Sequence, residues 1–141
     1  HNTAVEKVIE NHKVLGIKRA IKLPVSAPFH CGLMKKAADS MEEHINSLEV
    51  LTPNIILINN VNASPITDPL KIKESLIKQI TATVRWRESI QNMCNLGGSY
   101  FIEIGAGNVL SGLVKRINKN VESISIQNVS DIENFVNNLE R

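Results

Sequence analysis

The sequence has few cysteines, few aromatic residues and no long apolar run. Its two cysteines, Cys31 and Cys94, are far apart and form no C-x-x-C pair, so the sequence indicates neither a zinc site nor a disulfide framework. No apolar stretch approaches the roughly 20 residues that a membrane-spanning helix requires, and no signal peptide is recognisable. We therefore expect a cytoplasmic protein with no membrane partner and no bound metal.

The charge balance is close to neutral. The 16 Lys and Arg residues exceed the 14 Asp and Glu residues only slightly, which gives a formal net charge of +2. Basic pairs at 18–19, 35–36 and 115–116 are scattered along the chain and are typical of solvated faces rather than of a groove. The composition therefore offers no argument for a nucleic-acid partner.

A serine nucleophile of the hydrolase type is also missing. Such a serine sits on a sharp strand-to-helix turn with the pattern G-x-S-x-G. The nearest approach, Gly97-Gly98-Ser99, is followed by Tyr100-Phe101 where a second glycine is required. The residues present here therefore supply no nucleophile of this kind.

The most informative stretch is 23–34, which carries a histidine between an extended run and a helical pattern. Pro24 and Pro28 bias the residues before them toward extended conformations, and the helical pattern begins only at Leu33. An imidazole at this junction, that of His30, can point into a cleft and suits a general base. The alternative is a histidine that only caps or packs the loop. The adjacent Cys31 could be a nucleophile, but neighbouring residues on a strand or at a helix start point in different directions, so we favour a small packed thiol.

Helical and strand patterns alternate along the rest of the chain, whose 141 residues are within the size range of one domain. Apolar residues at helical spacing predict helices over 5–15, 33–48, 68–80, 86–96, 109–117 and 130–139. Short apolar runs predict strands over 17–23, 55–58, 100–104 and 121–126. The run at 55–58, which is rich in β-branched residues, predicts a strand buried on both faces, and 100–104 is expected to be the next buried strand. In the last helix, we expect Ile132, Phe135, Val136 and Leu139 to face inward. This alternation predicts an α/β fold with a parallel sheet.

A glycine-rich turn, Gly105-Ala106-Gly107, joins the strand at 100–104 to the helix at 109–117. Such a turn can cradle a phosphate at a helix N-terminus. A dinucleotide site requires a third glycine, however, and the chain has Leu110 at that offset. We therefore favour glycines that permit a tight turn and close packing.

Four separated motifs in the chain point to one family. They are the histidine stretch at 23–34, Leu57-Ile58 leading into Asn59-Asn60-Val61, the stretch 76–80 followed by Val84-Arg85-Trp86, and the stretch 101–110. In this order and at these spacings they closely resemble the C-terminal part of malonyl-CoA:acyl carrier protein transacylases. The resemblance extends to about Asn118. The family usually has Pro and Lys where this chain has Ala106 and Asn108, which affects the stiffness and the charge of that loop.

The resemblance implies a particular fold and a missing first part. The family combines a large α/β-hydrolase-like subdomain with a small ferredoxin-like subdomain inserted before the histidine. Residues 1–25 would then end the small subdomain, and residues 26–141 would form the C-terminal part of the large, parallel-sheet subdomain. The family keeps its nucleophilic serine well before the histidine, so the chain is interpreted as the C-terminal part of a longer enzyme. A part of this kind would expose a strand edge and apolar faces, which predicts self-association.

The resemblance also implies an activity and roles for individual residues. The reaction is the transfer of a malonyl group from malonyl-CoA to acyl carrier protein in fatty acid biosynthesis, by a Ser-His acyl-enzyme route without a permanently bound cofactor. His30 would be the general base, and the backbone carbonyl of Gln79 would accept a hydrogen bond from its ring. Phe29 would form a wall of the acyl pocket and favour malonyl over methylmalonyl.

Two other functions remain open on the sequence. The chain could be a non-catalytic piece that binds a partner, either the missing N-terminal part of its own enzyme or an acyl carrier protein whose acidic helix meets Lys35-Lys36 or Lys115-Arg116. It could also be an acyltransferase domain of a larger polyketide or fatty acid synthase.

Overall fold

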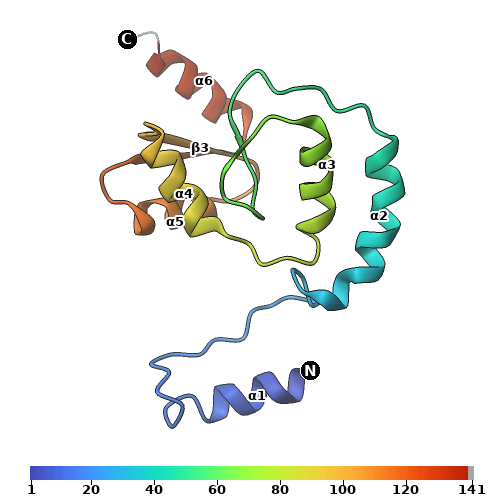
Figure 1. Ribbon diagram of the computed structural model, residues 1–141. Coiled ribbons are helices and arrows are strands. Elements are labelled where there is room, and N and C mark those ends of the chain that lie inside the picture. The colour runs from blue at the N-terminus through green and yellow to red at the C-terminus, as the bar shows by residue number, and fades with distance from the viewer. Residues whose placement is uncertain (140–141) are drawn as a thin grey trace.

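The computed structural model describes residues 1–139 as an α/β chain with short strands (Figure 1). The elements are α1 (Asn2–Glu10), η1 (Gly32–Met34), α2 (Lys35–Ser47), β1 (Leu57–Ile58), β2 (Pro65–Ile66), α3 (Pro69–Lys78), α4 (Trp86–Asn95), β3 (Tyr100–Ile104), α5 (Val109–Ile117), β4 (Glu122–Ile126) and α6 (Val129–Leu139). None of the helices in this described part is long and apolar enough to cross a membrane.

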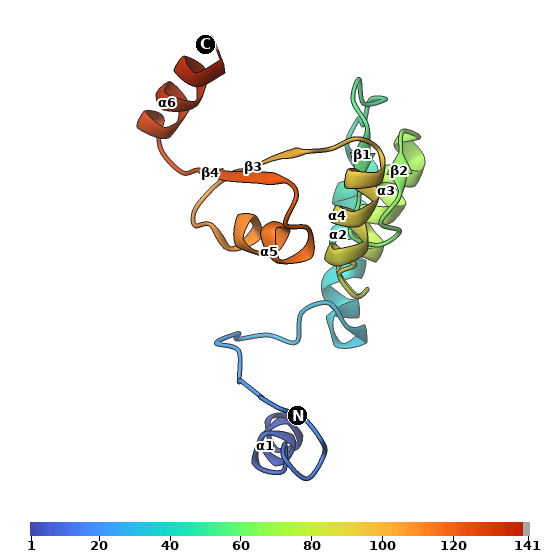
Figure 2. The ribbon, with the colours of Figure 1, turned by 90° about the vertical axis from the view of Figure 1, so that its left-hand side faces the viewer.

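Strands β3 and β4 form the parallel pair that the sequence predicts. Their register runs from Tyr100 opposite Glu122 to Ile104 opposite Ile126, and α5 is the crossover helix between them. Helix α5 packs on one face of the pair (Figure 2). Ile102 and Ile104 on the other face are 40% and 82% exposed, so β3 is not the fully buried strand that its apolar run predicts.

The predicted strand at 55–58 is wrong in extent and environment. Only Leu57 and Ile58 are paired, and they pair with Pro65 and Ile66 in the antiparallel direction. Ile55 is 80% exposed. A strand buried on both faces requires neighbouring layers on both sides, and residues 1–139 do not provide them here.

The predicted strand at 17–23 does not form. After the turns at 11–16, residues 17–25 form neither a helix nor a strand, with Ile21 63% exposed and Leu23 69% exposed, and this segment pairs with no strand among the described residues. An ion pair between Lys22 Nζ and Glu6 Oε1, 3.0 Å apart, ties it to α1. In both views α1 and this segment lie apart from the other elements (Figures 1 and 2).

Helices α2 and α3 pack side by side, with His30 in the turn that precedes η1 and α2 and with Gln79 at the C-terminal end of α3. Helix α3 begins where the sequence predicts, because the Asp68 carboxylate accepts hydrogen bonds from Leu70 N at 2.8 Å and Lys71 N at 3.4 Å. Buried apolar residues join the two helices: Ala38 and Ile45 from α2, and Ile72 from α3. The expected helices at 33–48 and 68–80 are thereby confirmed.

Helix α6 forms, but the face predicted to point inward is largely open. Ile132, Val136 and Leu139 are 49%, 44% and 68% exposed. Helix α6 does contact β4, and the half-buried Phe135 has its ring centroid 6.4 Å from that of Tyr100. Apolar spacing predicts which residues share a face, whereas burial depends on what covers that face, and the described chain covers little of it.

Candidate active site around His30

His30 lies in the turn that leads into η1, and its backbone is strained. Its φ angle of 57° is in the left-handed region, where it is one of two described residues other than glycine. A residue with a Cβ in this region loses roughly 1–2 kcal/mol relative to the right-handed conformation. Such strain persists only where the surrounding contacts fix it, and it is concentrated at functional sites.

The imidazole of His30 is held by a main-chain carbonyl at the end of α3. Nδ1 of His30 donates to the carbonyl oxygen of Gln79, at a distance of 3.0 Å. Because a carbonyl can only accept, this bond requires the tautomer that carries its proton on Nδ1. Nε2 is then unprotonated in the neutral ring and is free to take a proton from another group.

The Gln79 carbonyl is free because of its place at the helix end. Gln79 is the C-cap of α3, where the last carbonyls have no partner within the helix. The following N–H groups turn back to earlier carbonyls: Ile80 N donates to Ile77 O, while Thr81 N and Ala82 N both donate to Lys78 O. The oxygen of Gln79 is therefore left for the imidazole.

Gln79 also lines a small cavity that is bordered by a constrained loop. The cavity has a volume of about 180 Å³, and its lining includes Asn59, Asn60 and Gln79. The Asn59 side chain accepts hydrogen bonds from Val61 N and Asn62 N, both at 2.9 Å. This local turn fixes the loop next to the Gln79 carbonyl, which is a structural role for the asparagine motif that the sequence did not reveal.

Remote donors hold the same loop from the other side. Arg85 donates from its main-chain N to Asn60 O at 3.0 Å and from Nη1 to Asn62 O at 3.3 Å. Asn92 donates to the carbonyl of Ala63, which is fully buried and has a φ angle of 54°. Ala63 is the second described residue other than glycine in the left-handed region, and these bonds fix it there.

Phe29 and Cys31 flank His30 in the sequence, and neither forms a hydrogen bond with its ring. Phe29 is 54% exposed and does not line the cavity beside Gln79. The Cys31 thiol donates to the carbonyl of Pro28 at 3.1 Å. Within residues 1–139, no group of three or more His, Cys, Asp or Glu side chains could hold a metal ion.

The N-terminus of α5 is occupied by a carboxylate from the chain itself. Its N-cap, Asn108, makes no side-chain capping bond. Glu103 on β3 instead accepts hydrogen bonds from Leu110 N at 3.2 Å, Ser111 N at 2.8 Å and Ser111 Oγ at 2.7 Å. The helix N–H groups that would bind a phosphate are thus already used, which supports a structural role for the Gly105–Gly107 turn.

The same contacts make Glu103 a source of pH-dependent stability. The hydrogen bond from Ser111 N, together with those from the Ser111 hydroxyl and Leu110 N, holds the pKa of Glu103 below its ordinary value. A depressed pKa stabilises the fold above the unfolded-state pKa, and this contribution is lost as the pH falls through the folded-state value. We expect Glu103→Gln to lower the melting temperature at pH 7 and to make little difference at pH 2–3.

Thermal unfolding followed by circular dichroism at the two pH values checks this expectation. Glu122→Gln is the matched control, since Glu122 is an exposed glutamate on the neighbouring strand β4. A Glu103→Gln deficit of the same size at pH 2–3 as at pH 7 would show that the carboxylate charge is not responsible.

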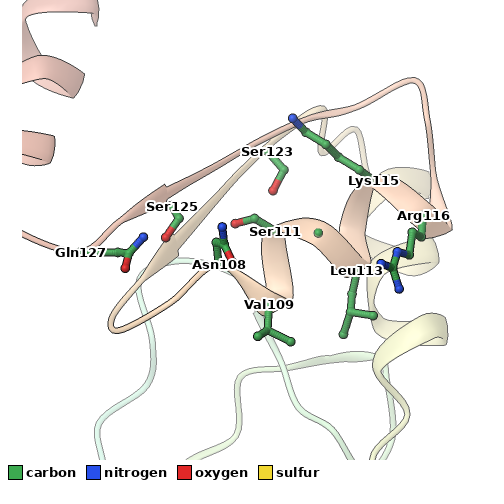
Figure 3. Close-up of a pocket in the computed structure, with 10 residues that line it drawn as sticks. Asn108, Val109, Ser111, Leu113, Lys115, Arg116, Ser123, Ser125 and Gln127 are labelled. Atoms are coloured by element: carbon green, nitrogen blue, oxygen red, sulfur yellow. The ribbon is translucent and has the colours of Figure 1, made fainter.

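A second, larger cavity forms a groove between α5 and β4. It has a volume of about 560 Å³ and is lined mainly by polar residues, with Gln127 at one end and Lys115 and Arg116 at the other (Figure 3). The hydroxyls of Ser111, Ser123 and Ser125 lie between these ends (Figure 3). The sequence indicated only that residues 115 and 116 are basic. The structure places them at one end of this groove, which is lined mainly by polar residues.

No protein-family model matches the chain, but individual proteins do. The chain is 43% identical over 129 residues to the malonyl CoA-acyl carrier protein transacylase of Bacillus subtilis (strain 168). This match covers 92% of the chain and 41% of the relative.

Solved structures of malonyl-transferring enzymes are also similar to the chain. The structure resembles an acyl carrier protein S-malonyltransferase from Vibrio cholerae with a TM-score of 0.84 and 44% identity, covering 94% of this chain and 43% of that one. It resembles a malonyl-transacylase solved in complex with a type II polyketide synthase acyl-carrier protein with a TM-score of 0.87 and 33% identity, covering 96% of this chain and 44% of that one.

The chain thus spans less than half the length of the relatives that it matches. The match nevertheless includes nearly all of this chain, at identities that indicate common descent and in the fold described above. Over 92% of its residues, the chain is therefore homologous to the malonyl CoA-acyl carrier protein transacylases, the family that its motifs resemble.

Proposed function

We propose that this chain supplies the general-base half of a malonyl-CoA:acyl carrier protein transacylase. The observation that carries the proposal is the 3.0 Å hydrogen bond from His30 Nδ1 to the Gln79 carbonyl. It joins two of the four motifs that resemble the family, across 49 residues of sequence, and it leaves Nε2 as the basic nitrogen. The chain would act as the C-terminal part of an enzyme. The nucleophilic serine of that enzyme would lie in the part that corresponds to the unmatched portion of the relatives.

The proposed chemistry has two matched halves. In the first, Nε2 of His30 takes the proton of the serine hydroxyl as the oxygen attacks the malonyl thioester, and the imidazolium returns that proton to the departing coenzyme A thiolate. In the second, Nε2 takes the proton of the phosphopantetheine thiol as its sulfur attacks the malonyl-serine ester. The proton then goes to the serine oxygen, and the malonyl group leaves on acyl carrier protein.

The Gln79 carbonyl is a suitable partner for His30 during these proton transfers. It fixes the ring orientation and the tautomer, as the carboxylate does in a Ser-His-Asp triad, but it adds no negative charge. Malonyl-CoA, with its free carboxylate and its phosphates, is itself an anion. A neutral orienting group avoids a further negative charge beside this substrate.

Phe29 is proposed to contact the acyl group. It immediately precedes His30 and is 54% exposed, so its ring is available to line a pocket completed by the remainder of the enzyme. An aromatic wall leaves little space for a branched extender unit, which favours malonyl over methylmalonyl. No permanently bound cofactor is required by this chemistry.

The acyl carrier protein is proposed to approach the basic end of the groove between α5 and β4. Lys115 and Arg116 lie there, and they are in the last turn of α5. Positive side chains at this position complement an acidic helix and steer its approach. Lys35-Lys36, at the start of α2, is the second candidate contact, although Lys35 is engaged with Asp39 at 2.7 Å.

The finer division of the chain belongs to the same proposal. Residues 1–25 are assigned to the end of a small ferredoxin-like subdomain and residues 26–141 to a large α/β-hydrolase-like subdomain. The separation of α1 and the segment at 17–25 from the other elements supports a boundary near residue 25 (Figure 2). A cytoplasmic location and a role in fatty acid synthesis, as opposed to a larger polyketide synthase, stay predictions.

A chimera tests the proposed function. In it, this chain replaces the matching 129 residues of the Bacillus subtilis relative, which retains the remainder of that protein. We expect the chimera to transfer labelled malonyl groups from malonyl-CoA to acyl carrier protein. A folded chimera that transfers no malonyl group, assayed beside the active Bacillus subtilis parent, would contradict the proposal.

The chain by itself is expected to form no malonyl-enzyme. It contains no G-x-S-x-G turn, and the Cys31 thiol is hydrogen-bonded to Pro28 O rather than to His30. Incubation of the isolated chain with malonyl-CoA followed by intact-mass spectrometry checks this, with the chimera as the positive control. A stable malonyl adduct on the isolated chain would show that a nucleophile is present in these 141 residues.

A further inference from the structure

The Cys31 side chain makes an unexpected contact. Cys31 is the N-cap of η1, with φ −147° and ψ 172°, but its side chain caps none of the helix N–H groups. The thiol instead points back along the chain, and its Sγ lies 3.1 Å from the carbonyl oxygen of Pro28. The cysteine therefore spans the two residues between them, Phe29 and His30.

This contact closes a short turn that has His30 near its centre. Pro28 fixes the start of the turn because its ring restricts φ. Cys31 fixes the end, since its own carbonyl accepts a hydrogen bond from Met34 N at 3.0 Å and so joins the turn to η1. The left-handed conformation of His30, with φ 57°, lies between these two anchors.

Two contacts thus hold His30, one on its side chain and one around its backbone. The Gln79 carbonyl orients the ring, at 3.0 Å from Nδ1. The Pro28–Cys31 bond holds the strained backbone from which the ring projects. Without the second contact, the backbone would be free to relax toward a right-handed conformation, which would carry the imidazole away from Gln79.

We propose that Cys31 is a positioning residue for His30, and that its thiol acts as the hydrogen-bond donor that fixes the His30 turn. The proposal rests on the proposed role of His30 as general base. The position requires a donor at Cys31 and not a nucleophile, since the proton of the thiol is used by the Pro28 carbonyl. A hydroxyl satisfies the same requirement, because it is a stronger donor than a thiol.

Substitutions at Cys31 separate a donor role from mere packing. Cys31→Ala removes the donor, and Cys31→Ser restores it with a smaller side chain. A weak S–H···O hydrogen bond shifts a conformational equilibrium by about two- to fivefold. Cys94→Ala is the matched control, because Cys94 is also free and half-buried but its sulfur accepts from Asn118 Nδ2, at 3.4 Å.

The test is the tautomer state of His30, measured on the 141-residue chain. Long-range ¹H–¹⁵N spectra at pH 8.5 report the protons on Nδ1 and Nε2 of neutral imidazoles, and the His30→Asn variant assigns the His30 signals. We expect mainly the Nδ1–H form in the wild-type chain, in Cys31→Ser and in Cys94→Ala. In Cys31→Ala we expect the ratio of Nδ1–H to Nε2–H forms to fall about two- to fivefold.

The outcomes distinguish this inference from the proposed function. An unchanged ratio in folded Cys31→Ala, or an equal fall in Cys31→Ser, would overturn the positioning role of Cys31. A wild-type His30 that is mainly Nε2–H would instead contradict the bond to Gln79 and with it the proposed general base. Circular dichroism of each variant establishes that the comparison is made on folded protein.

Discussion

Replacing His30 by alanine in the chimera is expected to slow acylation of the serine by about 10²- to 10⁴-fold, the usual loss when a general base is removed. The reason is that Nε2 of His30 is the basic nitrogen left free by the bond from Nδ1 to the Gln79 carbonyl. The measurement is single-turnover formation of the malonyl-serine ester from labelled malonyl-CoA. The loss should be largest near neutral pH and smaller at high pH, where hydroxide competes as a base.

His30→Asn is the control that separates chemistry from backbone strain. Asparagine tolerates the left-handed region better than alanine does, and its side-chain amide can donate to the Gln79 carbonyl as the imidazole does. We therefore expect His30→Asn to retain the thermal stability of the parent chimera and to lose as much activity as His30→Ala. Near-normal turnover in His30→Asn with an unchanged pH profile would mean that His30 is structural.

Local sequence signals predicted the helices after residue 32 and the parallel pair well, whereas the first helix, expected over 5–15, is Asn2–Glu10 and is followed by turns. Asp68-Pro69 starts α3, and Gly97-Gly98 follows the end of α4. The predicted ranges 100–104 and 109–117 coincide with β3 and α5. These elements are specified by capping residues, glycines and short-range periodicity, which act within a few residues of the position that they determine.

Burial was predicted less well, for a physical reason. The apolar runs at 17–23 and 55–58 and the apolar stripe of α6 indicate residues that prefer an apolar environment. They do not indicate which segment provides it. In the described chain Ile21, Ile55 and Leu139 are 63%, 80% and 68% exposed, because neither a neighbouring strand nor a helix covers them.

The candidate site was only partly visible in the sequence. His30 stands out locally because prolines precede it and a helix follows. Gln79 carries no local signal, since the relevant atom is a main-chain oxygen at a helix end, and only the family resemblance pointed to it. The roles of Glu103 and Asn59 were missed, although an asparagine that starts a turn is a recognised signal for the Asn59 bonds to Val61 N and Asn62 N.

The second large effect is expected from turning the Gln79 carbonyl without changing Gln79 itself. In the unsubstituted chain, the backbone of Gln79 is in the right-handed helical region, with φ −63° and ψ −20°. A proline at the next position disfavours this conformation for the residue before it and favours ψ near +120° to +160°. Ile80→Pro should therefore rotate the carbonyl away from His30 Nδ1. We expect it to slow transacylation by about 10²-fold, which is the lower end of the loss expected for His30→Ala.

Two matched variants give this experiment its contrast. Gln79→Ala keeps the main-chain oxygen and removes the half-buried side chain, so we expect activity within about twofold of the parent chimera. Ile80→Ala removes the side chain that proline also removes but leaves the backbone N–H that donates to Ile77 O, and it should likewise retain most of the activity. Transacylation rates are compared with helix content from circular dichroism. If Gln79→Ala were as inactive as His30→Asn, the side-chain amide would be the orienting group; if folded Ile80→Pro kept full activity, His30 would not depend on the Gln79 carbonyl.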